Sequence, residues 1–192
     1  MSGSHFTHFP GQLCGLLLSL WFVLPCPAQP PPPGEEEKPK VAAGGEVVDY
    51  QKLLPILPEP PAGWKADVAE GSTDDLGEAM ITNVHRDYFK GEAEDAPTTA
   101  ISILDSAANP EYVESTVAAW DVNASNPEGY TKSVTVEGLP GFETFENEGQ
   151  HGTLWLLIAK RYFLQIETTG QEAKELQEWL KRIDLKKLAA IK

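Results

Sequence analysis

The chain has 192 residues and a formal net charge of −14 at pH 7, from 29 acidic and 15 basic side chains. This excess of negative charge repels phosphate backbones and anionic lipid headgroups, so it argues against nucleic-acid binding and peripheral membrane binding. Both cysteines, Cys14 and Cys26, lie within the first 28 residues. A mature chain without those residues can form no disulfide bond, zinc–thiolate site or iron–sulfur cluster.

The N-terminal residues are typical of a secretory signal peptide. Leu13 to Leu24 is a largely apolar run, which is too short to cross a hydrocarbon core of roughly 30 Å because that takes about 20 helical residues. Pro25 ends the run, and the small residues Cys26 and Ala28 offer a cleavage site. We therefore predict that residues 1–28 are a removable signal peptide. The mature protein is then periplasmic or secreted, with no membrane insertion after signal removal.

Lipid anchoring is the alternative interpretation of the same residues. Cys26 could carry the lipid, with Val23-Leu24-Pro25 as the preceding recognition sequence. Proline fits poorly there because a small residue is expected directly before the lipidated cysteine. Residues 29–45 then form a linker rich in proline and glutamate, which we expect to be extended and disordered because its four consecutive prolines favour polyproline II and the Glu35–Glu37 run will not pack.

Residues 46–192 are predicted to form a single α+β domain. Apolar residues at helical spacing favour a short helix that ends at Pro55. Runs of alternating or β-branched residues predict strands at Met80–Phe89, Thr98–Leu104, Tyr130–Val136, Phe142–Glu146, Thr153–Ala159 and Arg161–Thr168. The link around Ala159–Arg161 is short enough for a tight hairpin, although it lacks the Asn or Gly that such a turn prefers.

Two further helices follow from their start signals and apolar stripes. Asn109 is a good N-cap residue and Pro110 suits the first helical position, so a helix should begin there. Leu176, Leu180 and Ile183 form the stripe of a closing helix over Gln171–Ile183, and a final short helix follows it.

The order of these elements predicts the fold class. Short hairpin links indicate a mainly antiparallel sheet of about six strands. The Thr153–Ala159 strand is apolar on both faces, which favours a strand that is covered on both sides. We therefore expect helices to flank the sheet in an α/β/α sandwich.

Four segments of the chain carry a resemblance to other proteins. Leu57–Trp64, Ser102–Ala107, Gly138–Phe145 and Ile183–Lys192 resemble uncharacterised exported proteins of Gram-negative bacteria. More distantly, the element order is similar to the PsbP-like sandwich, whose members are mostly non-enzymatic accessory and binding proteins. The resemblance implies a protein of the cell envelope, and it brings no catalytic residue or cofactor.

Few residues suggest a reactive site. His85 and Asp87 share one face of a predicted strand, and His151 is the other histidine outside the predicted signal peptide. Imidazole and carboxylate groups suit zinc, so these three residues are the candidates for a metal site if the fold brings them together. The chain has no G-x-S-x-G, S-x-x-K or H-E-x-x-H motif, and we identify no catalytic residue.

The sequence thus supports two hypotheses of different kinds. The first is an exported, non-enzymatic binding or accessory protein of the cell envelope that has no cofactor and an envelope protein as its partner. The alternative is a small metal-dependent or hydrolytic enzyme that uses His85, Asp87 and His151. The oligomeric state does not follow from either hypothesis.

Overall fold

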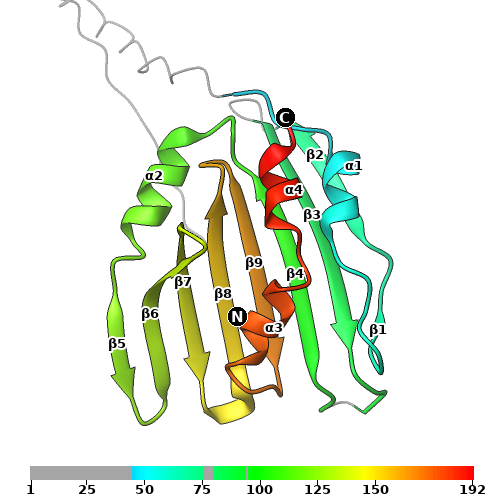
Figure 1. The fold of residues 1–192 in the computed structure, drawn as a ribbon, viewed down its shortest axis with the longest axis vertical. Coiled ribbons are helices and arrows are strands. Elements are labelled where there is room, and N and C mark those ends of the chain that lie inside the picture. Colours follow the sequence, from blue (N-terminus) through cyan, green and yellow to red (C-terminus); the bar gives the residue numbers. More distant parts are fainter. Residues whose placement is uncertain (1–44, 76–79, 94) are drawn as a thin grey trace, which may run out of the picture. The chain divides into compact units, whose positions relative to one another are not determined.

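A computed structural model of the chain describes residues 45–75, 80–93 and 95–192 (Figure 1). These residues all belong to one compact unit, Val41–Lys192. The predicted signal peptide, residues 1–28, and the predicted linker up to residue 44 lie outside the described residues. Gly45, the last linker residue, donates a backbone hydrogen bond to Ala107 O at 2.7 Å.

The described residues build a single antiparallel sheet of nine strands. The strands are β1 Lys65–Ala66, β2 Glu70–Asp75, β3 Met80–Phe89, β4 Thr98–Asp105, β5 Asn123–Asn126, β6 Gly129–Val136, β7 Leu139–Glu146, β8 His151–Ile158 and β9 Tyr162–Thr169. Their order is β1-β3-β4-β9-β8-β7-β6-β5, with β2 also paired to β3. After β4 the chain passes through α2 to the far edge, and it returns strand by strand until β9 pairs with β4 (Figure 1).

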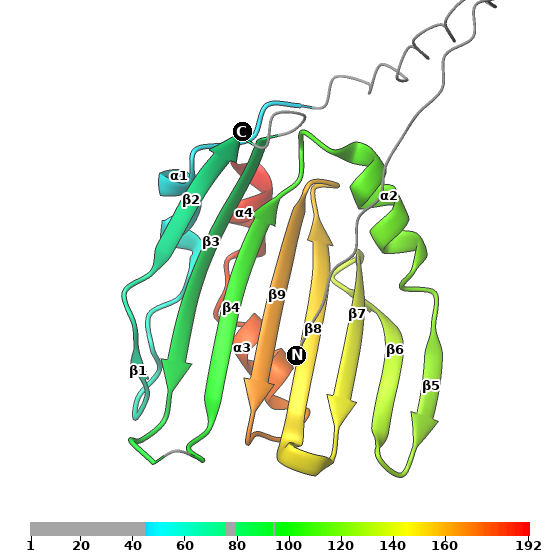
Figure 2. The same cartoon turned by 180° about the vertical axis from the view of Figure 1, so that it is seen from behind.

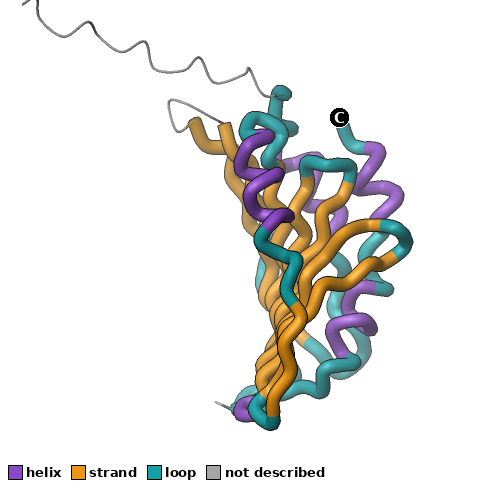
Figure 3. Tube along the Cα trace, turned by 90° about the vertical axis from the view of Figure 1, so that its left-hand side faces the viewer, coloured by secondary structure: helices purple, strands orange, loops and turns teal. Residues whose placement is uncertain are grey.

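The helices are all short. They are α1 Tyr50–Leu53, η1 Leu54–Ile56, α2 Pro110–Ala118, η2 Glu148–Gln150, α3 Glu175–Leu180 and α4 Leu185–Ala190. Figure 3 shows α2 on one side of the sheet, and α3 and α4 on the other. Among the described residues, no helix has the length and apolar character needed to cross a membrane.

The six predicted strands are confirmed, with their ends moved by up to three residues. The predicted fold class is nevertheless wrong. The sheet has nine strands instead of about six, and the helices are too few and short to form a layer on each face, so the unit is mainly β and not an α/β/α sandwich. The closing helix is also shorter than predicted, because α3 covers only Glu175–Leu180 of the expected Gln171–Ile183.

The three strands that sequence reasoning missed are polar edge segments. β2 has the sequence EGSTDD and β5 the sequence NASN, and neither alternates apolar with polar residues. Strand pairing at a sheet edge needs only backbone groups on one side and no apolar face. The hydrophobic pattern therefore carries no signal for these strands.

The main core lies between the sheet and the helices α1, α3 and α4. Its members are buried apolar residues of the central strands, such as Ile101, Leu156 and Ile166, packed against Leu53, Leu176 and Leu188 of the three helices. A smaller cluster lies on the other face, where Val113 of α2 and Trp120 cover Leu157 and Phe163. The ring centroids of Trp120 and Phe163 are 5.8 Å apart in an edge-to-face contact, a favourable aromatic geometry.

Candidate functional site

The two faces of the sheet are covered to very different extents. Cross-strand registers place Val84, Ile101 and Leu164 on the face that α3 and α4 cover, and all three are buried. On the opposite face, the residues packed against the α2 cluster are Leu104, Val117, Phe142 and Trp155. Figure 2 shows that no described helix lies over the rest of this face.

We call this uncovered region the open face. Strand alternation and the registers assign to this side mainly polar or small residues, together with the partly buried Ile81 and Phe89 of β3. The residues that we take as the open face are Glu70, His85, Asp87, Ala100, Ser102, Thr131, Thr144, Glu146, His151, Thr153, Gln165 and Glu167, and none of them is buried. It extends across β2, β3, β4, β9, β8, β7 and β6.

Polar contacts connect several open-face side chains, both within β9 and between neighbouring strands. Ser102 Oγ donates to Gln165 Oε1 at 3.3 Å, and Gln165 Nε2 donates to Glu167 Oε2 at 3.4 Å. His151 Nε2 lies 3.6 Å from Glu167 Oε1. These contacts are long, so they hold the side chains weakly and leave their polar atoms accessible to a partner.

The structure brings together only two of the three predicted metal ligands. On β3, His85 Nε2 lies 2.9 Å from Asp87 Oδ2. His151 is on β8, and β4 and β9 lie between β3 and β8. At about 4.8 Å per strand, His151 is at least about 14 Å from the pair. One zinc ion binds ligands at about 2 Å, so these three residues do not surround one metal.

Across the described ranges 45–75, 80–93 and 95–192, no group of three or more His, Cys, Asp or Glu residues could hold a metal ion.

Charge is distributed unequally between the two faces. Among the described strand positions on the side of the open face, Lys65 is the single Lys or Arg. It lies on β1 at one corner and pairs with Glu92 at 2.7 Å. Arg86 and Lys132 are on the other face, and the helical segment 174–187 adds five more Lys or Arg side chains there. No Lys or Arg occurs between positions 90 and 132, which include α2 and β5.

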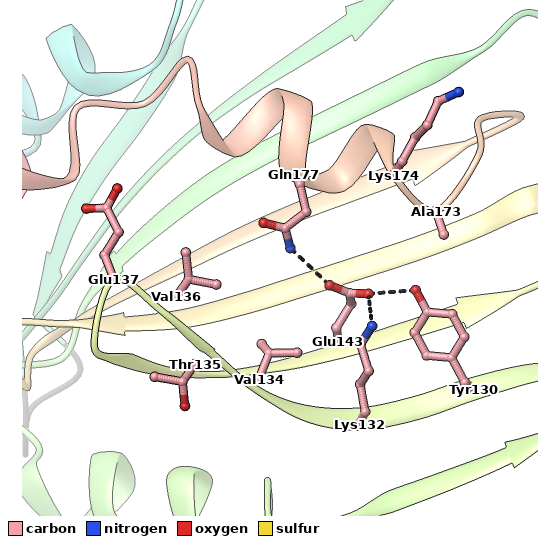
Figure 4. Close-up of a pocket in the computed structure, with 10 residues that line it drawn as sticks. All are labelled: Tyr130, Lys132, Val134, Thr135, Val136, Glu137, Glu143, Ala173, Lys174 and Gln177. Atoms are coloured by element: carbon pink, nitrogen blue, oxygen red, sulfur yellow. Dashed lines mark hydrogen bonds and ion pairs between the residues drawn. The ribbon is translucent and has the colours of Figure 1, made fainter.

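A second candidate site is a pocket between β6, β7 and α3 (Figure 4). Glu143 of β7 lies at its centre with 5% of its side chain exposed, and it faces the helices because it shares a sheet face with Gly141 and Phe145. Its carboxylate accepts from Tyr130 Oη at 2.6 Å, Lys132 Nζ at 2.9 Å and Gln177 Nε2 at 3.1 Å.

The contacts of Glu143 in this pocket serve the structure of the protein. Burial, followed by the hydrogen bond to the Glu143 carboxylate, raises the pKa of Tyr130, so Tyr130 stays a neutral donor and is no base. Gln177 belongs to α3, so its bond fastens that helix to the sheet. Glu143 was not predicted from the sequence, because Phe142 and Phe145 on either side of it lie on opposite faces of β7 and their pattern does not say which face is buried.

Comparisons with known proteins add no assignment. No family model matches the chain, and neither a curated protein nor a solved structure matches it. The resemblance to exported bacterial proteins therefore stays a prediction from the sequence.

Proposed function

We propose that this chain is an exported, non-enzymatic binding protein that serves as an accessory factor in the cell envelope. One observation supports a binding role: the open face is a broad part of a nine-stranded sheet that no described helix covers. The apolar-in, polar-out pattern of an antiparallel sheet explains why this face tolerates water. Its size and accessible hydrogen-bonding groups suit it to contact another macromolecule.

The surroundings of the open face fit this role. Trp155 and Phe142 are half-buried at its border with the α2 cluster, and partly exposed aromatic residues are enriched at protein interfaces. The Asp87 and Glu167 side chains remain 53% and 42% exposed although each is paired with a histidine. The enzyme hypothesis gains no comparable support, because its three residues are not assembled into one site.

Site-specific photocrosslinking in intact cells of the native host tests the proposal. A photoreactive residue is placed at Thr144 or Thr153 on the open face, and at Lys186 in α4 as the matched control on the helical side. We expect both open-face positions to yield the same crosslinked envelope protein, and the control to yield none. Equal crosslinking from Lys186, or none from the open face, would contradict the proposal.

Export is tested separately from binding. The full chain is expressed in the same host, the periplasm and medium are fractionated, and the intact mass of the mature protein is measured. We expect a mass that corresponds to cleavage near Ala28, which removes Cys26, whereas the mass of a lipidated chain that begins at Cys26 would indicate lipid anchoring. Recovery of the uncleaved chain from the cytoplasm would refute the envelope location.

A further inference from the structure

We infer that the open face binds a protein segment rich in lysine and arginine. This inference rests on the proposed function, because it specifies the chemistry of the partner that the open face binds. Its basis is charge complementarity. Four of the open-face residues are acids, whereas Lys65 at the corner is the sole Lys or Arg among the described strand positions on that side and is already paired.

The difference in charge between the open-face side and the helical side of the sheet does not follow simply from the negative net charge of the chain. The chain has 15 basic residues, and the helical side receives Arg86, Lys132 and the five basic residues of segment 174–187. Cationic groups approaching the sheet from the open side therefore meet carboxylates without a neighbouring cation to repel them. Complementary potentials of this kind accelerate association and reject partners of the wrong sign.

The positions of the acids suit an extended partner segment. Asp87 and Glu167 both lie opposite Ala100, on the strands that flank β4, so their backbones are about 10 Å apart at the usual strand spacing. Glu146 lies opposite His151 on the neighbouring β7 and β8. The hydroxyl groups of Thr144 and Thr153 lie between these charges, and they can accept hydrogen bonds from ammonium or guanidinium groups.

The border of the open face favours cations as well. Trp155 is half-buried beside Gln165 on the adjacent strand. Indole faces attract Lys and Arg side chains, and the interaction is worth about 0.5–1 kcal/mol at exposed sites. A basic segment could thus use both the carboxylates and the aromatic border, which neither an acidic nor a purely apolar segment could.

A defined peptide tests this inference in vitro. Fluorescence anisotropy is measured at low ionic strength with a labelled peptide of alternating lysine and serine, and with the same peptide carrying glutamate instead of lysine. The open-face triple variant is Asp87→Asn, Glu146→Gln, Glu167→Gln. The matched control, Glu59→Gln, Glu172→Gln, Glu178→Gln, removes the same number of charges from exposed acids on the helical side.

We expect the parent protein to bind the lysine peptide and not the glutamate peptide. The affinity of the open-face variant for the lysine peptide should be at least tenfold lower than that of the parent, and the affinity of the control variant should lie within twofold of the parent. Circular dichroism verifies that both variants are folded. Equal weakening by both variants would show binding to net charge only and overturn the inference. Three other results would also overturn the inference. The first is equal binding of the two peptides, and the second is no binding of either. The third is self-association of the parent protein that is lost in the open-face variant, with no binding of the peptide.

The two proposals can fail separately. If Thr144 and Thr153 crosslink to a partner whose contacting segment lacks Lys and Arg, the open face is a binding surface but the inferred chemistry is wrong. If the open-face positions crosslink to nothing, the proposed function fails whatever the peptide does. The last experiment titrates calcium chloride into the protein by calorimetry. If the parent gives a heat of calcium binding that the open-face variant lacks, and the parent does not bind the peptide, the ligand is a divalent cation and the inference is overturned.

Discussion

Arg161 forms a two-point ion pair with Asp105, whose side chain is fully buried at the end of β4. Arg161 Nε donates to Asp105 Oδ1 at 3.0 Å, and its Nη2 donates to Oδ2. The same carboxylate accepts from the backbone N–H groups of Val48 and Ala107 at 2.8 and 3.1 Å. The hydrogen bond to Asp105 raises the pKa of Arg161. This arrangement fixes the start of the described unit to the corner of the sheet.

Removing the Asp105 carboxylate should therefore destabilise the fold strongly. Asp105→Ala leaves the Arg161 guanidinium and two backbone donors without their acceptor, which we expect to cost about 3–5 kcal/mol of unfolding free energy. Urea denaturation measures this loss. Asp121→Ala, at an exposed position, is the control and should change stability by less than about 0.5 kcal/mol. Similar stabilities of the two variants would show that the pair contributes little.

Replacing Glu143 should loosen α3. Glu143→Gln removes the negative charge that pairs with Lys132 and replaces one acceptor oxygen by an NH2 group, so at least one of the donors Tyr130, Lys132 and Gln177 loses its acceptor, and we expect a loss of about 1–3 kcal/mol. Glu146→Gln on the same strand is the matched exposed control. Hydrogen exchange should show faster amide exchange in α3 for Glu143→Gln only. Unchanged exchange in that helix would contradict the fastening role.

Alkaline pH should weaken the fold through Tyr88. Burial raises the pKa of Tyr88 from 10.0 to about 12, and its hydroxyl donates to Pro58 O at 2.7 Å. The folded state therefore keeps a proton that the unfolded state loses, so the unfolding free energy should fall between about pH 10 and 12. At about 1.4 kcal/mol per pKa unit, the loss is on the order of 2 kcal/mol.

Denaturation series at pH 9 to 12 check this sign. Tyr88→Phe should show a flatter decline than the parent, because the shifted hydroxyl is gone. Tyr112→Phe, whose parent side chain is 43% exposed, should decline like the parent. A parent whose stability stays constant or rises over this range would rule out the Tyr88 effect.

The β8–β9 turn offers a stabilising substitution. Ala159 and Lys160 have φ angles of 52° and 55°, which fit a two-residue turn but disfavour side chains with a Cβ atom. Lys160→Gly should stabilise the fold by about 0.5–1 kcal/mol. The reciprocal change Gly138→Ala, at φ 82° in the β6–β7 turn with no atom near the added Cβ, should cost about 1 kcal/mol. Thermal denaturation distinguishes these opposite signs, and a destabilised Lys160→Gly would contradict the strain argument.

Only part of the candidate metal site could be predicted from the sequence. His85 and Asp87 were predicted to share one strand face, and they do form a pair, because alternation along one strand is a local property. His151 was proposed to join them and does not. Its distance from His85 depends on which strands lie between, and no residue near either position specifies that order.

The sequence by itself determined the central strands, the start of α2 at Asn109 and the tight link at Ala159, since apolar alternation, capping and chain length act over a few residues. The tertiary structure alone decided that polar edges such as β5 join the sheet, that Glu143 fastens α3, and that no described helix lies over the open face. These features depend on backbone pairing and on contacts between residues far apart in the chain. Such contacts form only when the whole sheet is assembled.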